Sequence, residues 1–166
     1  MENRDFAPVK KDKNDLQTRL RKLAKNELVG DIFYILLGIF FALFIYTGLK
    51  FALATPDPIV TVVSGSMIPT LQIGDMLFLK GIDPETIVEG DIIVYYYPPM
   101  GKLIIHRVFE MYDDGSFRTK GDNSITNSKP DPWTVQPEWV HGTPILRIPY
   151  LGYPRILLEK TIDLML

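Results

Sequence analysis

The stretch "DIIVYYYPPMGKLIIHRVFEM", Asp91 to Met111, holds two runs of β-branched, apolar and aromatic residues on either side of a segment rich in proline and glycine. Val, Ile, Tyr and Phe favour strands, whereas "PPMGK" has the composition of a turn. The sequence therefore predicts strands over Asp91–Tyr97 and Leu103–Met111.

Similar short runs lie on both sides of this stretch, separated by turn sequences such as "LQIGD", "GIDPE" and "DDGS". They predict four further strands: Ile59–Val63, Met76–Lys80, Phe117–Lys120 and Pro144–Ile148. Regular short strands with glycine, proline and aspartate turns indicate a mostly β fold, here a small antiparallel β-sandwich or barrel-like domain. We assign this domain to residues 55–150.

An apolar segment, "IFYILLGIFFALFIYTGLKFALA", precedes the β-rich region. It covers Ile32–Ala54, and its 23 residues include a single charge, Lys50. A helix rises about 1.5 Å per residue, so a segment of this length crosses the roughly 30 Å hydrocarbon core of a bilayer. A core helix that is apolar all round would need a larger domain around it, and a cleaved signal peptide has a shorter apolar region. The sequence predicts an uncleaved transmembrane helix over residues 31–54.

The flanking charges predict the orientation of this helix. Lys10–Lys25 contains seven basic residues, whereas Phe51–Leu79 contains none. By the positive-inside rule, residues 1–30 are cytoplasmic and the β-domain is extracytoplasmic or lumenal. Leu16–Val29 has helical spacing and is expected to lead into the span as a helix.

Composition excludes several classes of protein and site. The absence of cysteine excludes disulfides and cysteine-bound zinc, and two histidines are too few for a multi-histidine metal site. A net charge of -2 gives no basic excess of the kind that nucleic-acid-binding proteins carry. We expect no metal, no organic cofactor and no nucleic-acid partner.

The turn "SGSM", Ser64–Met67, directly follows a predicted strand. A serine at a strand end is most often structural. The alternative is that Gly65 permits a tight turn that exposes Ser66 as a nucleophile beside backbone amides able to stabilise an oxyanion. Such a serine needs a base elsewhere in the chain.

His106 interrupts an apolar predicted strand, whereas the other histidine, His141, falls in a glycine-bounded segment expected to be an exposed loop. A lone histidine in a strand is usually not catalytic, but imidazole is suited to accept a proton near neutral pH. The polar loop Thr119–Pro132 offers Asp122 and Asp131, which are either ordinary turn residues or partners for the His106 ring.

Four blocks, "SGSMIPTL", "GDIIVYY", "LIIHRV" and "TKGDN", resemble in order and spacing those of type I signal peptidases of the archaeal and endoplasmic-reticulum branch, the Ser-His-Asp type. The resemblance implies a membrane-anchored serine endopeptidase that removes signal peptides from translocated preproteins. It also implies the partners: signal peptides, the lipid bilayer, and the translocon or other signal peptidase subunits.

The same resemblance implies roles for individual residues. Ser66 corresponds to the nucleophile, and Ser64 to a residue that supports the oxyanion. His106 stands where the bacterial branch has a lysine base.

The loop that begins with "TKGDN" offers two candidates for the aspartate of the triad. A second aspartate usually follows the one in "GDN" by about six residues, but here that place holds Ser128, and Asp131 comes nine residues after Asp122. We expect Asp131 to complete the triad and Asp122 to order the site.

Two other functions are compatible with parts of this pattern. One is a non-catalytic, membrane-tethered β-domain that binds extended peptides. The other is a self-cleaving serine protease of the repressor type, which normally uses a lysine base and has no need of a membrane helix.

The C-terminal segment, residues 151–166, is too short to cross a membrane. The twelve residues after Pro154 would reach about 18 Å as a helix. We expect them to lie at the outer interface of the membrane, or to pack on the membrane helix or a partner subunit.

Overall fold

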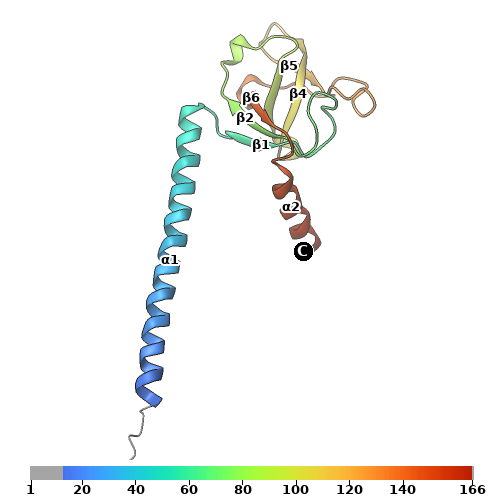
Figure 1. The fold of residues 1–166 in the computed structure, drawn as a ribbon. Helices are drawn as coiled ribbons and strands as arrows, with labels where there is room; N and C mark the ends of the chain where they lie inside the picture. Colours follow the sequence, from blue (N-terminus) through green and yellow to red (C-terminus); the bar gives the residue numbers. More distant parts are fainter. Residues whose placement is uncertain (1–12, 166) are drawn as a thin grey trace, which may run out of the picture. The chain divides into compact units, whose positions relative to one another are not determined.

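The computed structural model describes residues 13–165, which begin with helix α1 (Lys13–Ala52) and end with helix α2 (Tyr153–Met165) (Figure 1). Lys10 and Lys11, which contribute to the orientation argument, lie outside the described residues. Six strands lie between the two helices: β1 (Ile59–Thr61), β2 (Met76–Lys80), β3 (Ile92–Tyr97), β4 (Lys102–Met111), β5 (Phe117–Lys120) and β6 (Val140–Ile148).

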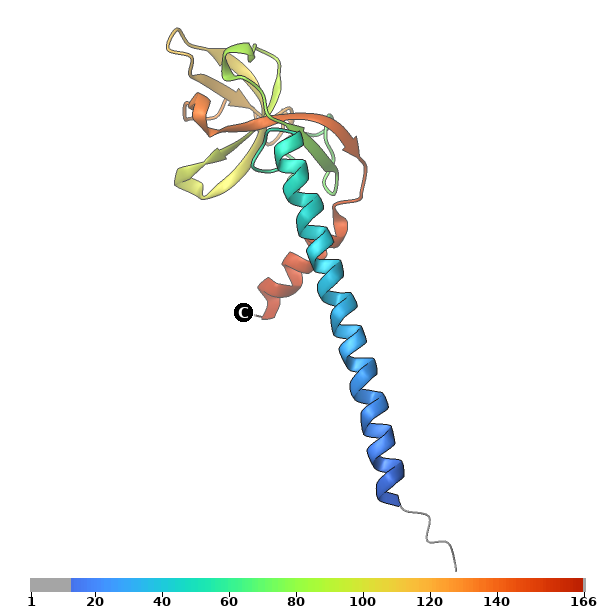
Figure 2. The same ribbon diagram turned by 90° about the vertical axis from the view of Figure 1, so that its left-hand side faces the viewer.

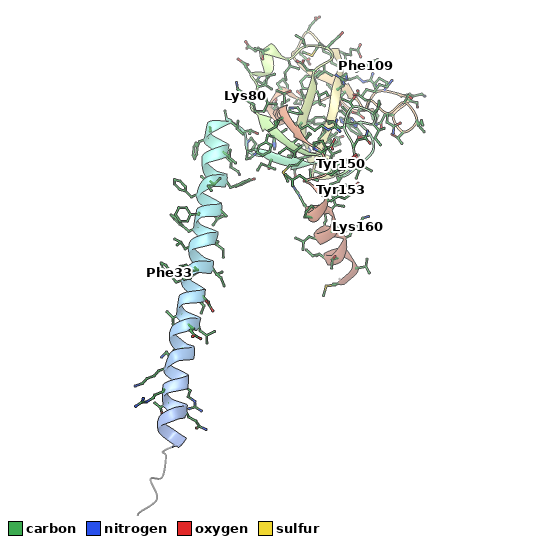
Figure 3. The ribbon with its side chains drawn as sticks, viewed as in Figure 1. Phe33, Lys80, Phe109, Tyr150, Tyr153 and Lys160 are labelled. Carbon is green, nitrogen blue, oxygen red and sulfur yellow. The ribbon has the colours of Figure 1, made fainter. Side chains whose placement is uncertain are left out.

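Helix α1 is continuous over 40 residues and joins the predicted Leu16–Val29 helix to the apolar segment. The 26 residues Glu27–Ala52 form a helix long and apolar enough to cross a membrane. Side chains such as Phe33 project outward and are exposed (Figure 3). Such a surface is suited to a hydrocarbon environment. The chain forms two compact units, with the boundary after Ile45. The last residues of α1 therefore belong to the same unit as the strands.

The strands form one sheet in the order β1-β2-β6-β3-β4-β5 with every neighbouring pair antiparallel, which confirms the predicted mostly β, antiparallel class. Strands β3 and β4 form a hairpin in which Val94 pairs with Ile105. Gly101 closes its turn with a left-handed φ of 62°, a conformation that glycine adopts without strain. The two strands predicted in the opening stretch are thus present to within one residue at each end.

The start of β6 was predicted wrongly. The strand begins at Val140 rather than Pro144 and includes His141, which the sequence had placed in an exposed loop. Pro144 pairs with Leu79 where the β2–β6 register shifts, and a bulge tolerates the missing N–H of proline. The strand therefore continues through the proline and across the domain to the segment before α2 (Figure 2).

Apolar side chains cover both faces of the sheet. Val94 lies in one buried cluster, whereas its neighbours Ile93 and Tyr95 lie in the other, as the two-residue repeat of a strand requires. The first cluster consists of Val60, Val62, Met67, Leu71, Leu77, Leu79 and Val94. The second consists of Ile87, Ile93, Tyr95, Val108, Phe117 and Val135. The central strand β3 is therefore buried on both faces, and His106 is carried by the strand beside it.

Candidate active site

The turn at Ser66 is held by its neighbour Met67. The Met67 side chain is only 1% exposed and is part of the first apolar cluster. Backbone hydrogen bonds from Ile68 N to Gly65 O (3.2 Å) and from Leu71 N to Met67 O (2.9 Å) close the turn. With Met67 in the core, the adjacent Ser66 is half-buried and lines a cavity of about 780 Å³.

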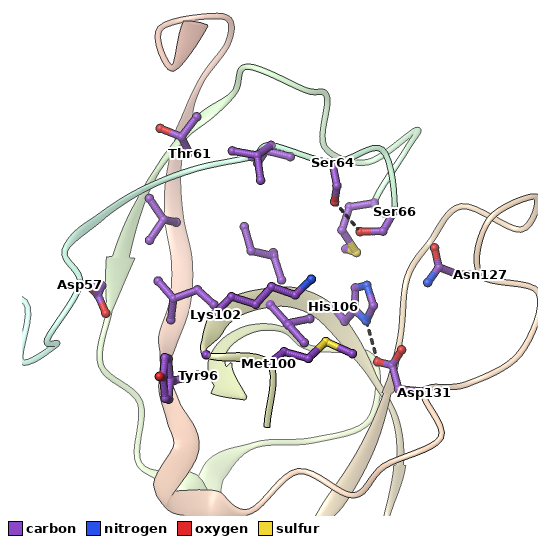
Figure 4. Close-up of a pocket in the computed structure, with 18 of the residues that line it drawn as sticks. Asp57, Thr61, Ser64, Ser66, Tyr96, Met100, Lys102, His106, Asn127 and Asp131 are labelled. Carbon is purple, nitrogen blue, oxygen red and sulfur yellow. Dashed lines mark hydrogen bonds and ion pairs between the residues drawn. The ribbon is translucent and has the colours of Figure 1, made fainter. Parts of the chain in front are cut away.

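His106 and Asp131 line the same cavity and contact each other (Figure 4). The His106 Nδ1 atom is 2.6 Å from Asp131 Oδ2, and both residues are buried, at 6% and 5% exposure. A carboxylate accepts hydrogen bonds, so Nδ1 carries the proton of a neutral ring. Nε2 is then the nitrogen available to accept a proton from a hydroxyl in the cavity.

The carboxylate of Asp131 has further partners that fix its position. Thr119 Oγ1 donates to Asp131 Oδ2 at 2.6 Å, and Asp131 N donates to Thr119 O at 2.8 Å. Tyr95 Oη lies 3.0 Å from Thr119 Oγ1, and Trp133 Nε1 donates to Tyr95 Oη at 3.1 Å. Burial raises the pKa of Tyr95 to about 12, so this hydroxyl stays protonated. The sequence did not reveal the support that Asp131 receives from Thr119, Tyr95 and Trp133, because nothing in their spacing links them to Asp131.

Asp122, the other candidate aspartate, is bound elsewhere. Arg107 donates to both of its oxygens, with Nε at 2.8 Å and Nη2 at 2.6 Å, and Thr70 Oγ1 donates at 2.5 Å. The Arg107 hydrogen bonds lower the pKa of Asp122 below its usual value, although partial burial opposes this. Asp122 therefore connects β4 to the segment that follows Ser66, while Asp131 is the aspartate in contact with His106.

The residues on either side of Asp122 contact the backbone of the Ser66 turn. Asn123 N donates to Ser66 O at 2.8 Å, and Asn123 Nδ2 donates to Gly65 O at 2.9 Å. A Cβ at Gly121 would lie 2.6 Å from Ser66 O, so only glycine permits this approach. The tripeptide "GDN" thus holds the turn in place. Sequence reasoning gave a role to its aspartate alone.

Ser64 lies beside Ser66, with its Oγ 3.3 Å from Ser66 Oγ (Figure 4), and among residues 13–165 no other side chain forms a hydrogen bond with the Ser66 hydroxyl. Ser64, Ser66, His106 and Asp131 therefore line one cavity, whereas Asp122 lies outside its lining. Across residues 13–165, no group of three histidine or acidic side chains is placed to hold a metal ion. The arrangement of these four side chains is suited to proton transfer and nucleophilic attack.

Comparison with known proteins identifies the family of the chain. Residues 32–112 match the family described as "Signal peptidase, peptidase S26", a region that contains Ser66 and His106. A protein of Pyrenophora teres f. teres named "Signal peptidase complex catalytic subunit sec11" is 34% identical over 144 residues, which cover 81% of this chain and 83% of that protein.

Two further relatives carry names of the same kind. A Colletotrichum graminicola protein named "Signal peptidase complex catalytic subunit SEC11" is 37% identical, over 72% of this chain and 74% of its own length. The dog protein named "Signal peptidase complex catalytic subunit SEC11C" is 34% identical, over 69% of this chain and 62% of its own length. These similarities over most of the chain, together with the serine turn and the histidine strand, establish that the chain belongs to the signal peptidase family, peptidase S26.

Proposed function

We propose that this protein is a membrane-anchored serine endopeptidase that cleaves signal peptides from translocated preproteins, with Ser66, His106 and Asp131 as its catalytic triad. The observation that carries the assignment of residues is the buried His106–Asp131 pair in the cavity that Ser66 lines. The family supplies the substrate class.

Ser66 Oγ attacks the carbonyl carbon of the scissile bond while His106 Nε2 takes the hydroxyl proton. The C–N bond then breaks, and His106 returns the proton to the leaving amine. Water attacks the resulting ester, again with His106 as base, and releases the acyl group from Ser66. Asp131 keeps the ring in the required tautomer and stabilises the imidazolium in both steps.

Ser64 and the backbone amide of Ser66 are the donors that stabilise the oxyanion. Ser64 Oγ is within 3.3 Å of Ser66 Oγ, so its hydroxyl is close to the place where the tetrahedral oxygen forms. Asp122 has a different role, which is to hold the segment after Ser66 against strand β4 by accepting hydrogen bonds from Thr70 and Arg107.

The membrane determines how the substrate is presented. With an N-terminus on the cytoplasmic side, the β-domain lies on the extracytoplasmic or lumenal side, where translocated chains emerge. The apolar segment of a signal peptide remains in the bilayer and delivers the following extended residues to the cavity. The relatives named as subunits of a signal peptidase complex make other subunits, and the translocon, the expected protein partners.

Helix α2 is expected to lie at the outer interface of the membrane. Its 13 residues span about 20 Å, which is too short for the hydrocarbon core. Arg155 and Glu159 line the active-site cavity, whereas apolar residues such as Leu158 and Ile162 are exposed. A tag fused after Leu166 should react with a reagent only from the non-cytoplasmic side of sealed vesicles. Protection on the non-cytoplasmic side, with exposure on the cytoplasmic side, would show instead that the C-terminal helix spans the membrane.

The central experiment uses the full chain, purified in detergent or lipid, with a presecretory protein as substrate. Wild type should release the mature protein at one bond, and Ser66→Ala should bind the precursor without cleaving it. Lys102 also lines the cavity, so Lys102→Ala is the matched control for a lysine base. If wild type and Ser66→Ala bind the precursor equally and neither cleaves it, a peptide-binding domain is favoured. Loss of cleavage in Lys102→Ala with activity in His106→Ala would favour the repressor type.

A further inference from the structure

A second histidine–aspartate pair lies on the side of the domain where α1 ends. His141 Nδ1 is 2.6 Å from Asp57 Oδ2, and the two side chains are 20% and 33% exposed. The ring of Tyr96 is stacked against His141, with centroids 6.2 Å apart and an interplanar angle of 11°. Asp57 and Tyr96 lie at the far end of the cavity from Ser66 (Figure 4). The proposed reaction makes no use of this pair.

The chain leaves α1 through a closed turn rather than a flexible linker. Ala54 N donates to Phe51 O at 3.3 Å and Thr55 N donates to Lys50 O at 3.2 Å. Ala54 has a left-handed φ of 49°. These two bonds and this conformation are those of a Schellman motif, which ends a helix with a defined exit direction. A left-handed alanine is unfavourable unless its surroundings hold it.

Strand β2 supplies part of those surroundings through Gly81, the residue after its end. Gly81 N donates to Leu53 O at 2.7 Å, and a Cβ at Gly81 would lie only 2.0 Å from Ala54 O. No other residue type allows the two backbones to approach so closely. The end of the membrane helix is therefore in direct backbone contact with the β-domain.

Strand β6 supplies the other contacts that hold the segment leaving α1. Thr55 is buried, and its Oγ1 donates to His141 O at 2.7 Å. Two residues further on, Asp57 holds the side chain of the same histidine. His141 is thus bound through its backbone and its ring to the segment that leaves the helix, and this double attachment joins the segment to β6.

The attachment leads to the active site through two adjacent ladders of the sheet. Gly142, next to His141, pairs with Val94 on β3. On the same strand, Ile93 pairs with His106 on β4. Hydrogen-bonded strands hold their residues at fixed distances from one another. The point where the chain leaves the membrane therefore lies at a defined distance from His106 and Ser66.

We propose that Leu53–Asp57, bound to Gly81 and His141, acts as a rigid junction that decides which peptide bond of a membrane-inserted precursor reaches Ser66. The inference rests on the proposed function. A signal peptide held in the bilayer places its cleavage site at a set distance from the membrane surface. If the enzyme holds Ser66 at a fixed distance from the point where its own chain leaves the membrane, only one peptide bond of the precursor reaches Ser66. His141 and Asp57 are positioning residues, because they act through the placement of the site and do not touch the reacting atoms.

The test compares two substrates of the full-length enzyme in liposomes. One is a preprotein inserted by its signal peptide, and the other is a short soluble peptide that spans the same cleavage site. A loosened junction should impair cleavage of the inserted preprotein and leave cleavage of the soluble peptide unchanged. For His141→Ala we expect peptide kcat/KM within about twofold of wild type, and preprotein cleavage lowered about tenfold, since small misplacements of this kind are costly in rate. Asp57 lines the cavity, so Asp57→Ala is scored by the position of the cut in the preprotein.

The position of the cut separates a positioning role from a merely structural one. Mass spectrometry of the mature N-terminus should show one product for wild type and a mixture of neighbouring products for both alanine variants. Asp57→Asn keeps an acceptor for His141 and should restore a single product. An insertion of two glycines between Thr55 and Pro56 should shift or broaden the cut even if the pair itself is intact.

Two results would overturn the proposal: equal losses on peptide and preprotein, or an unchanged single cleavage position in both alanine variants and the glycine insertion. Failure of the proposed function would look different, because wild type would then cleave neither substrate.

Discussion

The two histidine–aspartate pairs have the same contact geometry and different surroundings. In each pair, Nδ1 lies 2.6 Å from a carboxylate oxygen. His106 and Asp131 are almost fully buried, and the cavity that they line also contains Ser66. His141 is partly exposed, its backbone oxygen is bound by Thr55, and Tyr96 covers its ring. A paired imidazole is therefore no evidence of catalysis by itself. His106 differs from His141 in that it lines the same cavity as Ser66, whereas His141 is not part of that lining.

Replacement of each histidine by alanine tests this difference most strongly. His106→Ala should lower kcat on the soluble peptide by on the order of 10⁵-fold, because a serine without its base loses nearly all of the catalytic advantage. His141→Ala should stay within about twofold on that substrate. Steady-state peptide cleavage, with circular dichroism as the check on folding, measures both. Comparable losses in the two variants would contradict the assignment of His106 as the base.

The aspartates give the next largest effect. Asp131→Ala should lower kcat by on the order of 10⁴-fold, since the ring loses its orientation and its counter-charge in the transition state. Asp122→Ala should cost about 10²-fold, because it loosens the Ser66 turn without changing the His106 partner. Single-turnover kinetics would place both losses in the chemical step. A larger effect at Asp122 would reverse the two roles.

Removal of the Ser64 hydroxyl should have a moderate effect. Ser64→Ala removes one proposed oxyanion donor and should lower kcat by about 10²-fold, with KM nearly unchanged, because the donor acts mainly on the transition state. Ser64→Thr keeps a hydroxyl and serves as the matched control. If KM rises while kcat is constant, Ser64 binds the ground state instead.

The smallest effect concerns stability in acid. Arg107 lowers the pKa of Asp122 in the folded protein, so the stabilisation is fully present above the unfolded pKa of about 4 and is lost as the pH falls through the lower, folded value. At pH 6, Asp122→Asn should melt about 5 °C below wild type, and the difference should shrink below pH 4. A difference in Tm that is constant from pH 6 to pH 3 would show that the charge of Asp122 does not contribute.

Local patterns predicted much of the fold correctly. The apolar segment and the β3–β4 hairpin follow from the composition of contiguous residues, and both are present. The start of β6 was missed because Pro144 and Gly142 look like a break, whereas the bulge opposite Leu79 accommodates the proline. A bulge depends on the partner strand, so the sequence of β6 alone does not reveal it.

The sequence by itself identified Ser66 and His106 as candidates. A serine at a strand end and a histidine in an apolar strand can each be recognised from the few residues that surround them. Only the tertiary structure decided which aspartate contacts His106, since that depends on a loop path held by Thr119, twelve residues before Asp131. It also decided that His141 meets Asp57, 84 residues away in the chain. Periodicity and composition report on neighbours along the chain, whereas these contacts depend on the register of paired strands and on the close backbone approaches that Gly81 and Gly121 permit.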